Sequence, residues 1–218
     1  PVYDQGSLGS CTAQAVCAVL QFTEKEVVKG AKRPIPSRLF TYYNTRFQQG
    51  TEEYDSGGYL RTTVQSVKIH GYCPESKWKH DVKRFTEEPS DAAYEAALRH
   101  KLKVSMYARV SQGVTSLQTM LAAKNPVVFG FAVYDQVMEA AGRTGILVVP
   151  AKTDAQVGGH AVVLVGYDNK RRAFLVRNSW GTRWGDKGYF WMAYDYVLNR
   201  ELADDFWTIS AVPNIEEG

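Results

Sequence analysis

The spacing of hydrophobic residues divides the chain into a helical first half and a strand-rich second half. Between residues 12 and 28 the apolar positions fall on one face of a 3.6-residue period, which predicts a helix. Ser37 is a suitable N-cap for a second helix that reaches about Phe47. Two further helices are predicted over residues 59–69 and 91–99.

The second half contains short runs of β-branched and aromatic residues. Residues 160–167 form a continuous apolar run, which is typical of a buried strand. The turn pair Asp168-Asn169 follows, so residues 173–177 should return as the second strand of a hairpin. Helices followed by strands indicate an α+β protein with two lobes. The remaining elements are predicted as strands over 104–110, 127–133, 188–192 and 206–210, and a short helix over 117–123.

Composition and charge exclude several classes of protein. Hydrophobic residues make up 44% and charged residues 22% of the chain, as in ordinary globular proteins. No apolar stretch approaches the roughly 20 residues that span a bilayer, so no membrane partner is expected. The net charge is +3 and basic residues alternate with acidic ones, which argues against a nucleic-acid partner. The longest basic run, residues 170–172, follows the turn pair and is predicted to be a solvated hairpin tip.

The chain has three cysteines, an odd and low number that argues against a disulfide scaffold. Their spacing fits no common zinc pattern, and no metal or organic cofactor is expected. The sequence leaves a disulfide between Cys17 and Cys73 as an alternative, although Cys17 lies in an apolar run and should pack as a small hydrophobic side chain. At least one thiol is left over as a candidate for chemistry.

Cys11 stands where a glycine-containing loop enters the first predicted helix. Free N–H groups at a helix N-terminus favour an anion, and a thiol pKa of about 8.5 can fall by several units there. Gly6 and Gly9 let the backbone approach a substrate, and the Gln5 amide can donate to an oxyanion. The alternative is a glycine turn beside a buried structural cysteine.

His160 begins a buried strand directly after two glycines, whereas His70, His80 and His100 lie in polar segments and are predicted to be surface groups. A structural histidine is the alternative for His160. The hairpin brings Asn178 near the His160 end, where the amide oxygen can accept from the imidazole and fix its tautomer. Trp180 follows closely and can shield that hydrogen bond from water.

Three motifs together resemble the papain-like cysteine peptidases, in which a cysteine nucleophile, a histidine base and an asparagine orienter cooperate. The separation of Cys11 and His160 agrees with that family. The resemblance covers nearly the whole chain. It is carried by Gln5…Gly9-Ser10-Cys11, His160-Ala161, and Asn178-Ser179-Trp180-Gly181 with Trp184-Gly185.

The resemblance implies one peptidase domain over residues 1–218, with a mainly helical lobe (6–102), a mainly β lobe (103–218) that is antiparallel and barrel-like, and the active-site cleft between them. It implies the catalytic residues Cys11, His160, Asn178 and Gln5. It also implies peptide or protein substrates, a zymogen whose own prosegment inhibits it, a monomer, and a secreted or periplasmic location. The implied substrate-binding residues are Gly57, Gly58, Leu60, Gly130, Gly158, Gly159, Trp180 and Ile209.

Departures from papain itself mark a bacterial-type member: papain has a cysteine where Leu8 stands and an aromatic residue where Thr12 stands. Residues 139–157 are predicted to be an inserted surface loop before His160. The implied specificity pocket carries no charge, which predicts an endopeptidase that prefers a hydrophobic residue at P2, two positions before the cut. The alternatives are a catalytically silent peptide-binding protein on this fold and a transglutaminase-like amidase or acyltransferase.

Overall fold

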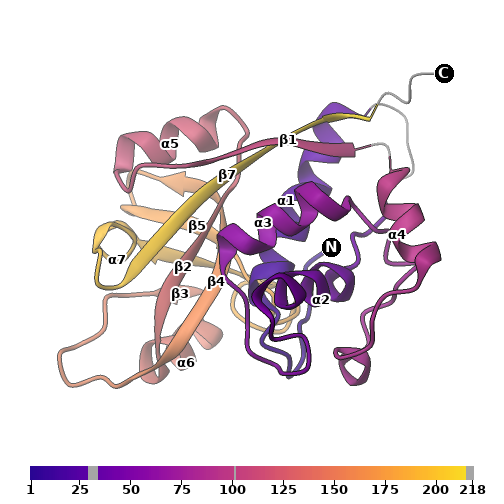
Figure 1. Cartoon of the computed structure of the whole chain (residues 1–218). Coiled ribbons are helices and arrows are strands. Elements are labelled where there is room, and N and C mark those ends of the chain that lie inside the picture. The colour runs from indigo at the N-terminus through magenta and orange to yellow at the C-terminus, as the bar shows by residue number, and fades with distance from the viewer. Residues whose placement is uncertain (29–33, 101, 215–218) are drawn as a thin grey trace. The chain divides into compact units, whose positions relative to one another are not determined.

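The structure, a computed structural model, describes residues 1–28, 34–100 and 102–214 (Figure 1). The chain forms two compact units. The sheet unit comprises Pro1–Gln5 and Arg109–Thr208, and the helical unit comprises Gly6–Ala108 and Ile209–Gly218. Each unit has a hydrophobic core of its own.

Three helices that pack on one another form the centre of the helical unit: α1 (Cys11–Val27), α2 (Arg38–Gln49) and α3 (Leu60–His70) (Figure 1). Ser37 caps α2 by accepting a hydrogen bond from the Phe40 N–H group at 3.1 Å, which confirms the predicted cap. In the described part of this unit, a short 3₁₀ helix, Val82–Arg84, and α4 (Asp91–Leu98) follow along the chain. The predicted helices over 12–28, 59–69 and 91–99 thus agree with the structure to within about one residue.

A seven-stranded sheet has the strand order β1-β7-β2-β4-β5-β6-β3. The β2, β4, β5 and β6 strands are antiparallel neighbours, whereas β3 pairs with β6 in parallel. The α+β class is therefore confirmed. The strands are β1 (Leu102–Arg109), β2 (Val127–Tyr134), β3 (Ile146–Leu147), β4 (Gln156–Asp168), β5 (Ala173–Arg177), β6 (Tyr189–Ala193) and β7 (Ala203–Pro213).

The sheet departs from the expected antiparallel, barrel-like form, because it includes one parallel pair and is not closed. Across the described strands the sheet is open, because β1 and β3 stand at opposite ends of the strand order. The β3 and β6 strands can pair in parallel because a long segment, residues 148–188 with β4 and β5, connects them instead of a tight turn.

Helices α5 (Val114–Ala122) and α6 (Asp135–Thr144) pack against strands of the sheet, and α7 (Tyr194–Leu198) follows β6. Their apolar side chains join the core of the sheet unit around Phe129, Phe174 and Phe190, all of which are fully buried. No helix in the described ranges is both long and apolar enough to cross a membrane.

The prediction of a surface loop over residues 139–157 was wrong for its first part, which belongs to α6 and β3. Val137, Met138 and Ala141 are buried on one face of α6, and this spacing is helical. Gly145 ends the helix in the left-handed conformation at φ +70°. The glycine at 142 is explained by packing, since a Cβ atom there would lie 2.9 Å from the Trp184 indole nitrogen.

The β4–β5 hairpin is present as predicted, with Val163 opposite Arg177 and Leu164 opposite Val176. Its tip at residues 169–172 is exposed, so the basic run is a solvated turn. In β2, Phe131 lies opposite His160. The hairpin and β2 together fix the position of His160 in the middle of the sheet.

Candidate active site

Cys11 is the first residue of α1 and is half-buried. The first turn of α1 contains no acidic residue, so no carboxylate there neutralises the positive end of the helix dipole. Ser10 directly precedes α1. The Gln14 backbone N–H group donates to the Ser10 carbonyl, and the Gln14 side-chain amide donates to the Ser10 hydroxyl, each at 3.0 Å. These bonds hold the start of the helix, which favours a negative charge at Cys11.

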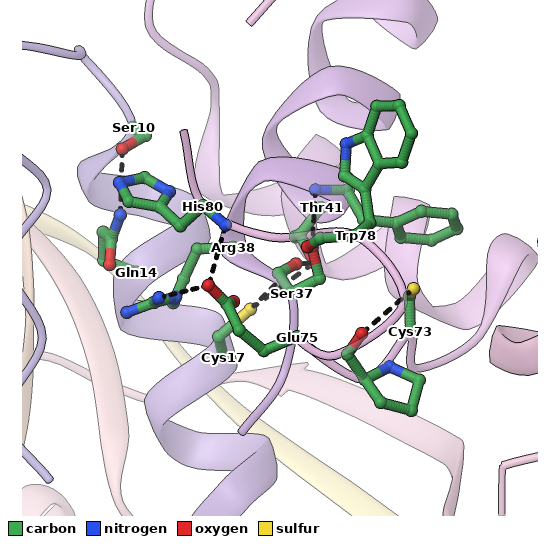
Figure 2. A network of polar contacts seen from close by, with 12 residues as sticks. Ser10, Gln14, Cys17, Ser37, Arg38, Thr41, Cys73, Glu75, Trp78 and His80 are labelled. Atoms are coloured by element: carbon green, nitrogen blue, oxygen red, sulfur yellow. Dashed lines mark hydrogen bonds and ion pairs between the residues drawn. The ribbon is translucent and has the colours of Figure 1, made fainter. Parts of the chain in front are cut away.

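The other two cysteines are structural. All three cysteines lie in the described part of the chain, and none of them forms a disulfide. Cys17 and Cys73 are buried, and burial raises the pKa of each thiol to about 12. The Cys17 sulfur lies 3.4 Å from the Thr41 hydroxyl oxygen, on α2 (Figure 2). Cys17 therefore packs as a small, protonated side chain, as predicted.

Figure 2 also shows how the segment after Cys73 is fastened to the start of α2. The Ser37 hydroxyl donates to the Trp78 carbonyl. The Glu75 carboxylate accepts from Arg38 at 2.8 Å and from the His80 N–H group at 2.7 Å. These contacts lie within the helical unit. They surround the buried thiols Cys17 and Cys73, which therefore have a structural role.

In the sheet unit, His160 Nε2 lies 2.8 Å from the Asn178 side-chain oxygen. The same oxygen accepts from the Ser179 N–H group at 2.8 Å, which identifies it as the carbonyl oxygen of the amide. A carbonyl oxygen can only accept, so Nε2 carries the proton. The other ring nitrogen, Nδ1, is then the one that can take up a proton during a reaction.

Aromatic rings cover the His160 ring within the sheet unit. Trp180 stacks on it, with ring centroids 4.6 Å apart and planes at 25°, and Phe131 packs edge-on at 5.7 Å. Trp184 in turn meets Trp180 edge-to-face at 5.2 Å. Asn178 is only 2% exposed, so its hydrogen bond with His160 is sheltered from water.

Burial lowers the pKa of His160 to about 4, and the hydrogen bond to Asn178 is a smaller influence in the opposite direction. The imidazole is therefore neutral at pH 7 within its own surroundings. A nearby anion would be needed to hold the charged form.

Gln5 also belongs to the sheet unit and is oriented by the residue that follows Asn178. The Gln5 N–H group donates to the Ser179 carbonyl at 2.9 Å, and the Ser179 hydroxyl donates to the Gln5 side-chain oxygen at 2.7 Å. The amide oxygen is thereby occupied, which leaves the NH₂ group as the donor for other partners. Sequence reasoning selected Gln5 but missed the orienting role of Ser179.

The predicted substrate-binding residues are divided between the two units. Gly130, Gly158, Gly159 and Trp180 lie in the sheet unit, and a Cβ atom added to Gly158 would meet nothing within 4 Å. In the helical unit, Leu60 begins α3, and the loop residues Gly57 and Gly58 precede it, whereas Ile209 is buried in β7.

Sequence reasoning missed Asp204. This residue lies opposite Gly130 in the β2–β7 pair, and a Cβ atom on Gly130 would be 3.2 Å from its carboxylate. Burial raises the pKa of Asp204, and the neighbouring Asp205 acts in the same direction. A carboxyl group therefore stands beside one of the residues predicted to line an uncharged pocket. The only sequence signal was the Asp204-Asp205 pair itself.

The prediction that His100 is a surface group was wrong. Its side chain is 8% exposed and its Nε2 lies 3.4 Å from the carboxylate of Glu24, which is 2% exposed. The Tyr72 hydroxyl donates to the other oxygen of Glu24 at 3.2 Å. The polar sequence around His100 hid this buried cluster because its partner lies on the distant helix α1.

Comparisons with known proteins identify the family. The profile of the papain family cysteine proteases matches residues 1–206. This chain belongs to the papain family of cysteine proteases. An uncharacterised peptidase C1-like protein, L477, of Acanthamoeba polyphaga mimivirus is 38% identical over 96% of this chain and 69% of its own length. A gut-specific cysteine proteinase of Caenorhabditis elegans is 28% identical over 87% of this chain.

The structure of xylellain, a cysteine protease from Xylella fastidiosa, is similar over 95% of this chain and 81% of its own, with 42% identity and a TM-score of 0.89. A Carica candamarcensis protease solved with the inhibitor E-64 shares the fold at 23% identity and a TM-score of 0.70. Membership of this family makes the protein a hydrolase that acts on peptides. The chain spans 62% of the nematode proteinase, so statements about a whole protein are proposals.

Proposed function

We propose that the protein is a cysteine endopeptidase in which Cys11 is the nucleophile, His160 the base and Asn178 the group that orients the histidine. The observation that carries this proposal is the sheltered hydrogen bond of 2.8 Å between His160 Nε2 and Asn178. It fixes the tautomer that leaves Nδ1 for proton transfer. The half-buried position of Cys11 at an uncapped helix N-terminus supports its role as the thiolate.

In the proposed reaction, Cys11 and His160 form a thiolate–imidazolium pair and the thiolate attacks a peptide carbonyl. The Gln5 amide and the Cys11 N–H group stabilise the tetrahedral oxyanion, a contribution on the order of 3 kcal/mol for each donor. His160 protonates the leaving amine and then activates the water that hydrolyses the acyl-enzyme. No metal or organic cofactor takes part.

The proposed substrate is a peptide with a hydrophobic residue at P2. This preference rests on the apolar character of Leu60, Ile209 and the glycines Gly130 and Gly158. The carboxyl group of Asp204, which lies beside Gly130, would instead favour a basic residue at P2. A panel of fluorogenic dipeptides with Leu, Phe, Arg and Glu at P2 decides between them, and a better rate with Arg than with Leu or Phe would refute the hydrophobic preference.

For the whole protein we propose a secreted or periplasmic, monomeric enzyme that is made as a zymogen and inhibited by its own prosegment. Structures with the same fold include a procathepsin B from Trypanosoma congolense and a procathepsin L from Tenebrio molitor, both solved as proenzymes. Gel filtration and detection of a larger precursor test these proposals.

The direct test compares peptide hydrolysis by the wild type with three variants: Cys11→Ala, His160→Ala and Asn178→Ala. We expect the first two to abolish turnover and the third to leave a residue of it. A thiol-specific epoxide should label the wild type stoichiometrically and leave Cys11→Ala unlabelled. Full activity in Cys11→Ala would overturn the assignment, while epoxide labelling without peptide cleavage would favour an amidase or acyltransferase, to be identified by mass spectrometry of products.

A further inference from the structure

A chain of hydrogen bonds inside the helical unit joins the loop before Cys11 to the loop that carries the glycine pair. The Gly9 N–H group donates to both carboxylate oxygens of Asp55, at 3.0 and 3.1 Å. The Tyr42 hydroxyl donates to the same carboxylate and accepts from the Gly57 N–H group at 3.2 Å. Thus the Gly9 N–H group of one loop is bonded to Asp55, the Gly57 N–H group of the other loop is bonded to Tyr42, and the two side chains are bonded to each other.

The two loops are also in close backbone contact. A Cβ atom on Gly9 would lie 3.2 Å from the Asp55 carboxylate and 3.5 Å from the Gly57 nitrogen. Gly57 itself has a φ of +74°, a conformation that other residues rarely adopt. The backbone conformation of Gly57 therefore requires glycine, whereas a Cβ atom on Gly9 would require the Asp55 carboxylate to move by a few tenths of an ångström. The hydrogen bonds therefore link the positions of the two loops.

Helix α2 supplies the rigid support for this arrangement. Tyr42 and Arg46 lie one turn apart on α2, both side chains are fully buried, and the guanidinium sits 4.1 Å above the Tyr42 ring. Arg46 donates to the carbonyl groups of Glu52 and Tyr54, the latter at 2.9 Å. The loop that leads to Asp55 is therefore fixed from the same face of α2 that presents the Tyr42 hydroxyl.

We propose that Asp55 and Tyr42 are positioning residues that set the substrate-binding glycine pair, Gly57 and Gly58, at a fixed distance from the loop of the nucleophile Cys11. This inference rests on the proposed function, because it assigns a purpose to the loops only if they bind and cleave a peptide. Neither side chain needs to touch the substrate. They determine the position of the bound peptide backbone relative to the reacting thiol. A small misplacement of the substrate lowers the reaction rate strongly.

The test uses Tyr42→Phe, Asp55→Asn and Asp55→Ala, with Tyr54→Phe as the matched control. Tyr54 belongs to the same loop, and its side chain is 71% exposed. We expect kcat/KM for a peptide substrate to fall about 10-fold in Tyr42→Phe and Asp55→Ala, mainly through KM, and less in Asp55→Asn, which keeps one acceptor. Alkylation of Cys11 by iodoacetamide should change by less than about twofold, because this small reagent needs no peptide site. Since Asp55 is exposed, the melting temperatures of Asp55→Asn and Asp55→Ala should change little.

Amide hydrogen exchange separates failure of this inference from failure of the proposed function. Exchange at Gly9 should accelerate in Asp55→Ala and exchange at Gly57 in Tyr42→Phe, whether or not the protein cleaves peptides. If the wild type is inactive but these accelerations occur, the proposed function fails and the loop connection stands without a catalytic purpose. If the wild type is active and both variants keep kcat/KM within about twofold, or if neither amide changes its exchange, the inference is wrong.

Discussion

Removing the Cys11 thiol should reveal the pKa that burial alone imposes on His160. In Cys11→Ala no thiolate can hold the imidazolium, so the pKa should lie near 4 instead of its ordinary 6.5. This lowering corresponds to about 3 kcal/mol in favour of the neutral ring. In the wild type, the proposed thiolate must offset at least that amount before His160 can be charged at pH 7.

The lowered pKa also predicts the direction in which stability depends on pH. The unfolded chain takes up the proton at His160 more readily than the folded one, so this contribution is complete above pH 6.5. It is lost as the pH falls from 6.5 toward 4, and the total loss from this group is about 3 kcal/mol. Urea unfolding of Cys11→Ala across this range, compared with the double variant Cys11→Ala, His160→Gln, isolates the contribution of His160.

The assay is a titration of the histidine ring protons by NMR, with His160→Gln used to assign the resonance among the four histidines of the chain. We expect the His160 resonance to titrate near pH 4 in Cys11→Ala and at clearly higher pH in the wild type. A pKa near 6.5 in Cys11→Ala would refute the argument from burial. The same pKa in both proteins would refute the thiolate–imidazolium pair.

Three further outcomes test other contacts. Ser179→Ala removes the hydroxyl that orients Gln5 and should lower kcat about 10-fold with little change in KM, as measured by steady-state kinetics; an unchanged kcat contradicts this role. Gly58→Ala places a Cβ atom 2.7 Å from a threonine methyl group on α2 and should lower the melting temperature by several degrees in differential scanning calorimetry. His100→Ala removes a partner of the buried Glu24 carboxylate and should cost about 3 kcal/mol in urea unfolding, whereas a loss below about 1 kcal/mol would show that the pair contributes little.

Local signals in the sequence predicted much of this protein. The period of apolar residues located α1, and the turn pair after the apolar run located the β4–β5 hairpin. The hairpin in turn placed Asn178 within reach of His160, and the structure shows that contact. These predictions succeeded because helical periodicity and turn chemistry depend on residues close together in the sequence.

Other elements could not be read from local patterns. The helix α6 was mistaken for a loop because its two glycines suggested breakers, although one ends the helix and the other makes room for Trp184. The parallel strand β3 has only two residues, too few for any period to show. His100 was misplaced because its polar neighbours are exposed while its own ring turns inward to Glu24.

The sequence by itself determined the groups that we propose for catalysis: a cysteine at the start of a helix, a histidine in a buried strand and an asparagine after the next strand. The tertiary structure decided how these groups are supported. The Gly9–Asp55 contact joins residues 46 positions apart, and the Gln5–Ser179 contact joins residues 174 positions apart. Such hydrogen bonds leave no periodic trace in a sequence, because only the packing of distant segments brings a donor and its acceptor within 3 Å of each other.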